Sequence, residues 1–378
     1  MWDDTVFVTT AISTDKRIER LAEDEPTEAP RRRRGRRGGR SSAPSTVHKF
    51  VILAINRSDG SVRWQQTARE EVPHEGTHQT GSWAANSSVT DGEHVYAYFG
   101  SRGLYCYDMQ GNLQWEKDLG DMSTRRSFGE GSSPVLYGDV IVINWDHEGD
   151  SFIIALDKRT GAELWKVDRD ESTSWSTPIV VEHNDNPQVV INATHRTRGY
   201  DLATGKTLWE CGGMTANTIP SPVTANGIVY VTSGFRGNAL QAIRLADAEG
   251  DITGAAAVVW DYGRDTPYVP SPLLYDDTLY FLKHNRGMLS AFNASTGEAY
   301  YGPERLEGIS DVYASPVGAA DRIYIASRDG VTLVIKHGST FEVLAENVLN
   351  DGFNASPAIV GKEIFLRGDK SLYCIASD

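Results

Sequence analysis

The sequence has few cysteines, and it has no long apolar run. Its 378 residues include three cysteines, at positions 106, 211 and 374, and they form neither a Cys-x-x-Cys motif nor a Cys-Cys pair. This excludes c-type haem attachment and argues against a disulfide framework. No stretch approaches the roughly 18–20 apolar residues that a transmembrane helix needs, and no signal peptide is visible. No segment has a helical period either, so the chain is expected to be all-β.

What the sequence has instead is a repeated phrase, Asp-x-x-Thr-Gly-x-x-x-Trp. Two copies are clear, at Ala155–Trp165 and Gly199–Trp209. Weaker copies occupy Ala54–Trp64, Cys106–Trp115 and Ala291–Tyr301, and a degenerate copy ends at Trp260. A period of roughly 40–50 residues with short β-rich segments is typical of the blades of a β-propeller.

Each copy predicts two strands joined by a tight turn. The aspartate ends one strand and accepts backbone N–H bonds across the turn, and the glycine supplies the positive φ of a bulged hairpin. The tryptophan lies on the outgoing strand, where it can cover the seam to the neighbouring blade while its N–H finds a carbonyl. The structural residues of the repeat are therefore Asp157, Gly161, Trp165, Asp201, Gly205, Trp209, Trp115 and Trp64.

A second phrase, Ser-Pro or Thr-Pro followed by apolar residues, begins each unit. It occurs at Ser132–Leu136, Ser176–Val180, Ser221–Ala225, Ser271–Tyr275, Ser315–Ala319 and Ser356–Val360, and a copy without proline lies at Asn86–Val89. Naming the strands of a blade A to D, we expect strand A to follow this phrase. The count predicts an all-β, eight-bladed β-propeller that forms a single domain over residues 1–378. Because Asp3–Thr10 matches a B strand, we expect a chain that is incomplete at its N-terminus, without strand A of blade 1 and strand D of blade 8.

One segment, residues 13–46, departs from the pattern. It contains an acidic stretch and then seven arginines between Arg31 and Arg40, and it lacks aromatic residues. We expect a disordered, arginine-rich insertion within blade 1. Such a run is able to bind nucleic acid, but the insertion carries +4 of a total charge of −14, so the rest of the chain carries −18. That balance disfavours a general nucleic-acid binder.

The two phrases resemble the repeats of the pyrroloquinoline-quinone dehydrogenase-like propellers, where they form the tryptophan-docking motif of eight-bladed rings. The resemblance covers nearly the whole chain outside residues 13–46. That superfamily contains enzymes and also non-catalytic proteins, and the chain looks most like its non-catalytic, exported bacterial members. The enzymes carry a vicinal disulfide and a calcium held by Glu, Asn and Asp, and neither set matches motifs here. The resemblance therefore implies no quinone cofactor.

The loops between strands B and C are polar and rich in arginine. Arginine's planar fork suits carboxylates, phosphates and peptide carbonyls. These loops give a candidate rim for a ligand or partner; the alternative is that the arginines bind acids of adjacent turns. The candidate rim residues are Arg102, His147, Glu148, Arg196, Arg236, Asn285, Arg286, Arg328 and Asp329.

The connection at Glu70–Trp83 is unusually long and contains His74 and His78. With His147 on the same expected face, these histidines are weak candidates for a metal site. A His-x-x-x-His pair needs a helix to align both ligands, and this glycine-containing loop offers none. We therefore expect no metal site, and no catalytic residues are assigned.

These observations favour a non-catalytic propeller that binds a protein or a small polar or anionic ligand through its B–C and D–A loops. We expect a monomer that is exported and periplasmic or associated with the cell envelope, with a cytoplasmic protein as the alternative. A quinone- or metal-dependent oxidoreductase with a site in the central funnel is the alternative function. Nucleic-acid association through the arginine-rich insertion is a second alternative.

Overall fold

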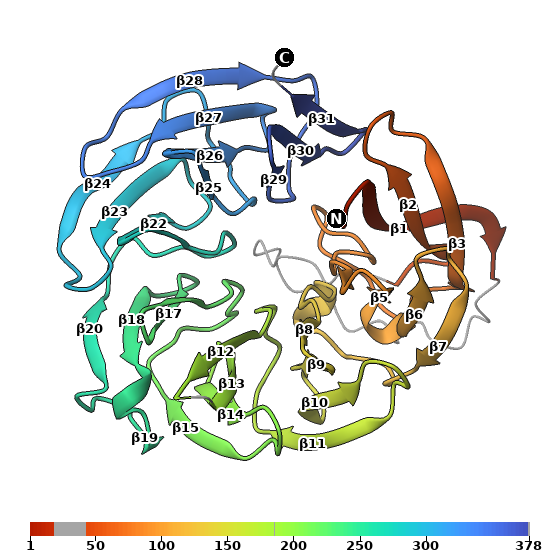
Figure 1. Ribbon diagram of the computed structural model, residues 1–378, viewed down its shortest axis with the longest axis horizontal. Helices are drawn as coiled ribbons and strands as arrows, with labels where there is room; N and C mark the ends of the chain where they lie inside the picture. The colour runs from red at the N-terminus through yellow and green to blue at the C-terminus, as the bar shows by residue number, and fades with distance from the viewer. Residues whose placement is uncertain (19–42, 185, 377–378) are drawn as a thin grey trace, which may run out of the picture. The chain divides into compact units, whose positions relative to one another are not determined.

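The computed structural model describes residues 1–18, 43–184 and 186–376. These residues form eight β-sheets, with three short 3-10 turns as the helical elements: η2 (Gly100–Arg102), η3 (Arg125–Ser127) and η4 (Leu245–Asp247). Within a sheet the strands follow one another antiparallel in chain order, with one added parallel strand as the exception (Figure 1). The prediction of an all-β chain with eight propeller blades is confirmed.

The chain divides into two compact units, residues 1–169 and 170–378. The first unit holds three sheets. Their strands are β1 (Thr5–Arg17), β2 (Thr46–Asn56) and β3 (Val62–Glu71) in blade 1; β4 (Val89–Thr90), β5 (His94–Tyr98), β6 (Leu104–Asp108) and β7 (Leu113–Lys117) in blade 2; and β8 (Val135–Tyr137), β9 (Val140–Trp145), β10 (Ser151–Asp157) and β11 (Glu163–Arg169) in blade 3.

The second unit holds five sheets. Blade 4 has β12 (Ile179–His183), β13 (Asn186–Ile191), β14 (Thr197–Asp201), β15 (Thr207–Cys211) and the added parallel strand β19 (Gly250–Asp251). Blade 5 has β16 (Val223–Ala225), β17 (Ile228–Ser233), β18 (Ala239–Arg244) and β20 (Val258–Tyr262); blade 6 has β21 (Leu273–Tyr275), β22 (Thr278–Leu282), β23 (Met288–Asn293) and β24 (Ala299–Arg305). Blade 7 has β25 (Val317–Ala319), β26 (Arg322–Ala326), β27 (Val331–Lys336) and β28 (Val343–Val348), and blade 8 has β29 (Ala358–Val360), β30 (Glu363–Arg367) and β31 (Leu372–Ala376).

The insertion in blade 1 begins further along the chain than the sequence predicts. Ser13–Arg17 continue β1, with Ser13 opposite His48 and Arg17 opposite Thr46. Backbone pairing with β2 extends β1 through this segment, although its polar side chains do not predict a strand. At the other end of the predicted segment, Thr46 begins β2, and the Ile18 N–H donates to Ser45 O at 3.0 Å. Residues 19–42 of the predicted disorder lie outside the described residues, and the expectation of one domain over the whole chain stays a prediction.

The serines of the Ser-Pro phrase join neighbouring blades. In the second unit, the serine or threonine that precedes the proline donates its backbone N–H to the hydroxyl of the corresponding serine in the next blade. The pairs are Thr177 to Ser221, Ser221 to Ser271, Ser271 to Ser315 and Ser315 to Ser356. In the first unit Ser87 donates to Ser133 in the same way. We call this series the serine ladder. It satisfies a backbone donor just before strand A, and in the rungs of the second unit the next residue is a proline, which has no N–H to offer.

The turn of the repeat has the local geometry that its residues dictate. Asp157 accepts hydrogen bonds from the N–H groups of Arg159 and Thr160, each at 2.9 Å. Gly161 has φ +67°, which suits glycine. A Cβ at Gly161 would lie 2.6 Å from the Trp115 ring of blade 2, whose indole N–H donates to the Lys158 carbonyl at 3.0 Å.

The same contact recurs at other seams. Trp64 donates to Met109 O at 2.9 Å and lies on Gly111, and Trp260 donates to Ala294 O at 2.9 Å and lies on Gly297. The apolar cores lie between consecutive sheets, as in the cluster that joins Tyr96 and Leu104 of blade 2 to Ile141 and Ile154 of blade 3. A tryptophan and an apolar core therefore hold consecutive blades together.

Trp209 makes a different contact. Between β18 and β20, residues 245–257 form η4, β19 and a turn at Thr253–Gly254, and β19 pairs parallel with β15 beside Trp209. The side chain of Trp209 is fully buried against Ile252 and Ala257, and its N–H donates to Gln188 Oε1 at 3.0 Å. Trp209 therefore fills the seam between blades 4 and 5, but its N–H partner belongs to its own blade.

Candidate functional site

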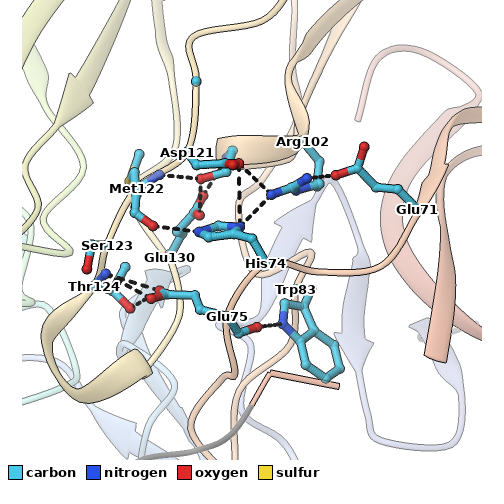
Figure 2. A network of polar contacts seen from close by, with 12 residues as sticks. Glu71, His74, Glu75, Trp83, Arg102, Asp121, Met122, Ser123, Thr124 and Glu130 are labelled. Atoms are coloured by element: carbon cyan, nitrogen blue, oxygen red, sulfur yellow. Dashed lines mark hydrogen bonds and ion pairs between the residues drawn. The ribbon is translucent and has the colours of Figure 1, made fainter. Parts of the chain in front are cut away.

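Three connections of the first unit meet in a network of polar side chains (Figure 2). Glu71 ends β3, and His74, Glu75 and Trp83 follow it in the connection to β4. Arg102 lies in η2, between β5 and β6, while Asp121, Thr124 and Glu130 lie between β7 and β8. A B–C loop thus lies between two D–A connections, as expected for loops at one end of neighbouring blades.

Arg102 is the centre of this network. Its side chain is buried and forms ion pairs with Glu71 and with Asp121, the latter at 2.6 Å. The guanidinium also donates to Nδ1 of His74, and Nε2 of His74 lies 2.6 Å from Met122 O. Because a guanidinium can only donate, Nδ1 of His74 accepts from Arg102, and Nε2–H donates to Met122 O. Arg102 and His74 are therefore saturated by the protein itself.

Two further carboxylates lie beside this network, and neither forms an ion pair with a cation of the described part of the chain. Glu75 accepts hydrogen bonds from the backbone N–H and hydroxyl of Thr124, and Glu130 accepts from the backbone N–H and hydroxyl of Ser101. Burial raises the pKa of both carboxyl groups, and the hydrogen bonds only partly oppose it. The nearby charge of Glu75 raises the pKa of Glu130 further.

These groups line a small pocket with an empty volume of about 320 Å³, part of it open to solvent. Glu75 and Glu130 contribute carboxylates, and Arg102 and His74 contribute the network described above. Aromatic rings complete the lining, from Phe50, Trp83 and Phe99. The arrangement offers negative charge next to aromatic surface, in a space that admits only a small group.

Replacing Glu130 with glutamine is expected to stabilise the protein at neutral pH, by an amount on the order of 1–2 kcal/mol, the usual cost of an incompletely compensated buried polar group. Because the folded-state pKa of Glu130 lies above its ordinary value, the folded protein keeps the Glu130 carboxyl group protonated to a higher pH than the unfolded chain does. Stability therefore falls as pH rises through the window between the two pKa values. The gain in E130Q should shrink as pH falls toward the ordinary glutamate pKa. Urea unfolding of both proteins across pH measures this, and a pH-independent difference would contradict it.

The other candidates in the first unit are occupied by local contacts. His147 is buried, accepts a hydrogen bond from Ser123 N–H at Nδ1 and lies 3.2 Å from Asp150 O at Nε2, while Glu148 is exposed. His78 bonds Thr80 Oγ1 at 2.7 Å and lies against Phe128. Within residues 1–18, 43–184 and 186–376, no group of three or more His, Cys, Asp or Glu side chains is placed to hold a metal ion.

In the second unit, three arginines of the B–C loops and adjoining strands bind nearby acids. Arg196 pairs with Glu210 at 3.2 Å and with Asp251 at 2.9 Å. Arg198 pairs with Asp170, Glu171 and Glu210, and Arg328 pairs with Asp311 at 2.5 Å. Asp329 accepts hydrogen bonds from the backbone N–H and hydroxyl of Ser310. These contacts hold each B–C loop against the connection that precedes its blade or against the outer strand of the same blade.

Arg236 and Arg286 differ from these arginines. Both are exposed, and neither forms an ion pair with any residue that the structure describes. Arg236 lies over the ring of Phe235 at 5.3 Å, and that ring stacks on Tyr268 at 4.9 Å. The neighbouring residue Asn285 has a buried Oδ1 that accepts no hydrogen bond from the described residues.

Backbone contacts fix the loops that carry these two arginines. His284 Nδ1 lies 2.7 Å from Gly234 O, and the His284 N–H donates to Thr266 O at 2.9 Å. The loop of Arg236, the connection holding Tyr268 and the loop of Arg286 are therefore linked through His284. They form one surface, which we call the blade 5–6 surface: Phe235, Arg236, Tyr268, Asn285 and Arg286.

The acids that pair with the arginines were not recognised in the sequence. Glu71, Asp121, Asp170, Glu171 and Asp311 all end strand D or lie in the connection that follows it. A signal existed, because an acid recurs in these connections ahead of the Ser-Pro phrase. Glu130 lies in a connection of the same kind, but its partner is Ser101 and not an arginine, and only the fold brings the two together.

Comparison with known proteins identifies the family. Residues 48–212 and 149–378 match the model of the family described as outer membrane protein assembly factor BamB. The chain belongs to this family. A search of curated protein sequences finds no match. The family assignment and the eight sheets together confirm the resemblance to the pyrroloquinoline-quinone-like propellers.

Solved structures share the fold. BamB from Moraxella catarrhalis superposes with a TM-score of 0.64 at 15% identity, over 98% of this chain and 99% of that one. The computationally designed protein Ika8 gives 0.61 at 15% identity, over 90% and 98%. A europium-containing methanol dehydrogenase gives 0.61 at 10% identity, over 85% and 80%. A designed protein and an enzyme thus share this fold, so the fold alone does not determine the function.

Proposed function

We propose that this protein is a non-catalytic β-propeller that binds a protein partner through the blade 5–6 surface. The observation that carries the proposal is the contrast among the arginines. Arg102, Arg196, Arg198 and Arg328 bind acids of the protein itself, whereas Arg236 and Arg286 are exposed without an ion pair among the described residues. Exposed arginine beside aromatic rings is the composition of protein-binding hot spots.

The family supports a place in the cell envelope. The family description and the Moraxella catarrhalis structure both name an outer membrane protein assembly factor or BamB. We infer by this analogy that the chain is an exported, envelope-associated binding protein, and that the seam tryptophans are its tryptophan-docking motif. None of the helical turns among the described residues is long and apolar enough to cross a membrane. The arginine-rich segment of the nucleic-acid alternative lies outside the described residues.

Site-directed photo-crosslinking in the producing cells tests this function. A photoreactive residue in place of Arg236 or Arg286 is expected to give an adduct with one discrete envelope protein, which mass spectrometry identifies. The charge reversal R236E/R286E should remove an adduct formed from Tyr268 while leaving the melting temperature unchanged, because neither side chain is buried. Arg159, an exposed arginine of a turn in the first unit, provides the control position. Equal adducts from Arg159, or none from the blade 5–6 surface, would overturn the proposal.

A further inference from the structure

The pocket of the first unit has unbalanced charge. Four carboxylates lie in or beside it, those of Glu71, Glu75, Asp121 and Glu130, against two guanidinium groups, those of Arg102 and of Arg69, which also pairs with Glu71. Arg102 is already paired twice, with Glu71 and Asp121, and both ring nitrogens of His74 already have partners within the protein. Among the residues that the structure describes, neither Glu75 nor Glu130 forms an ion pair, and each accepts hydrogen bonds from a backbone N–H and a hydroxyl. Partly buried carboxylates in this state attract a positive charge.

The rest of the lining selects the kind of cation. Phe50, Trp83 and Phe99 line the same pocket, and Trp83 is fixed by donating its indole N–H to Glu75 O at 3.1 Å. Aromatic surface next to carboxylates favours an organic ammonium group, which gains from the ring faces as well as from the charge. A metal ion needs several oxygen or nitrogen ligands around one point, and the part of the chain that the structure describes offers no such group.

We propose that this pocket binds one ammonium group, supplied either by a small alkylamine or by a lysine side chain of a partner. Arg102 and His74 act as positioning residues, since they hold the connection of Glu75 against η2 and leave the two free carboxylates facing the occupant. The site is independent of the blade 5–6 surface, so either proposal can fail without the other.

The test is calorimetric titration of the purified protein with methylammonium and tetramethylammonium chloride at constant ionic strength. We expect saturable binding of these cations and none of tert-butanol, a neutral molecule of similar shape. Glu75→Gln and Glu130→Gln should each weaken binding at least tenfold, and Trp83→Leu should weaken tetramethylammonium more than methylammonium. Glu163→Gln, which removes an exposed carboxylate of β11, should leave binding unchanged.

The remaining outcomes identify the source of the ammonium group and test the proposal itself. Tighter binding of a lysine-containing peptide than of methylammonium, lost when norleucine replaces the lysine, would identify a partner's side chain as the source. Equal or weaker binding of the peptide would identify a small amine. Binding of tert-butanol equal to that of the ammonium ions, displacement by potassium or calcium at equal concentration, or no binding by the wild-type protein would overturn the proposal, even if the pocket variants fail to fold.

Discussion

Trp209→Ala is expected to lower the free energy of unfolding by about 3–5 kcal/mol, the range for deleting a large buried aromatic side chain. Trp209 is fully buried between blades 4 and 5, and its indole N–H holds Gln188 Oε1, which the substitution would also leave without its donor. Urea unfolding followed by circular dichroism measures the loss.

The matched control for this prediction is Leu164→Ala, because Leu164 lies on the outer strand of blade 3 with half of its side chain exposed. That change should cost less than about 1 kcal/mol. Trp209→Phe should recover most of the packing but not the hydrogen bond. A loss below about 1 kcal/mol for Trp209→Ala would show that the seam does not depend on this side chain.

Arg169→Met is expected to cost about 3–5 kcal/mol, because it leaves the carboxylate of Asp146 buried without its cation. The two side chains form a bidentate pair, with Arg169 Nε 2.7 Å from Oδ1 and a second nitrogen 3.1 Å from Oδ2. Both side chains have no exposed surface. Equilibrium unfolding of the single variant gives the cost.

The double variant Asp146→Leu/Arg169→Met separates the pair's net contribution from the penalty of an orphaned charge. It should be more stable than Arg169→Met alone, since no buried charge then remains unpaired. Arg159→Met, at an exposed arginine 3.4 Å from Asp139, should change stability by less than about 1 kcal/mol. A double variant as unstable as the sum of its single changes would indicate that other contacts of these residues dominate.

The blades could be predicted because their signals are local. A turn such as Asp157–Gly161 is determined by residues within five positions of one another, and the Ser-Pro phrase marks where strand A begins. The same reasoning placed Trp209 on an outer strand correctly. It could not foresee the N–H partner of Trp209, because the segment that covers it, residues 245–257, carries η4 and β19 in addition to part of a degenerate copy of the phrase.

The pocket could not be predicted for a different reason. Its walls come from β2, from the connection after β3, from η2 and from the connection after β7, and no spacing in the sequence relates Phe50 to Glu130. The polarity of the arginine loops was visible, but which arginines are used internally depends on acids in other loops or strands. Pairing across connections is therefore information that only the fold supplies.

The serine ladder has a consequence for how such genes change. Each rung joins one blade to the next through the same two atoms, a backbone nitrogen and a side-chain hydroxyl, whatever the identity of the blades. A whole repeat inserted or removed in frame would therefore find compatible partners on both sides, as would two blades exchanged in order. The ladder therefore does not by itself restrict which blade follows which at these junctions.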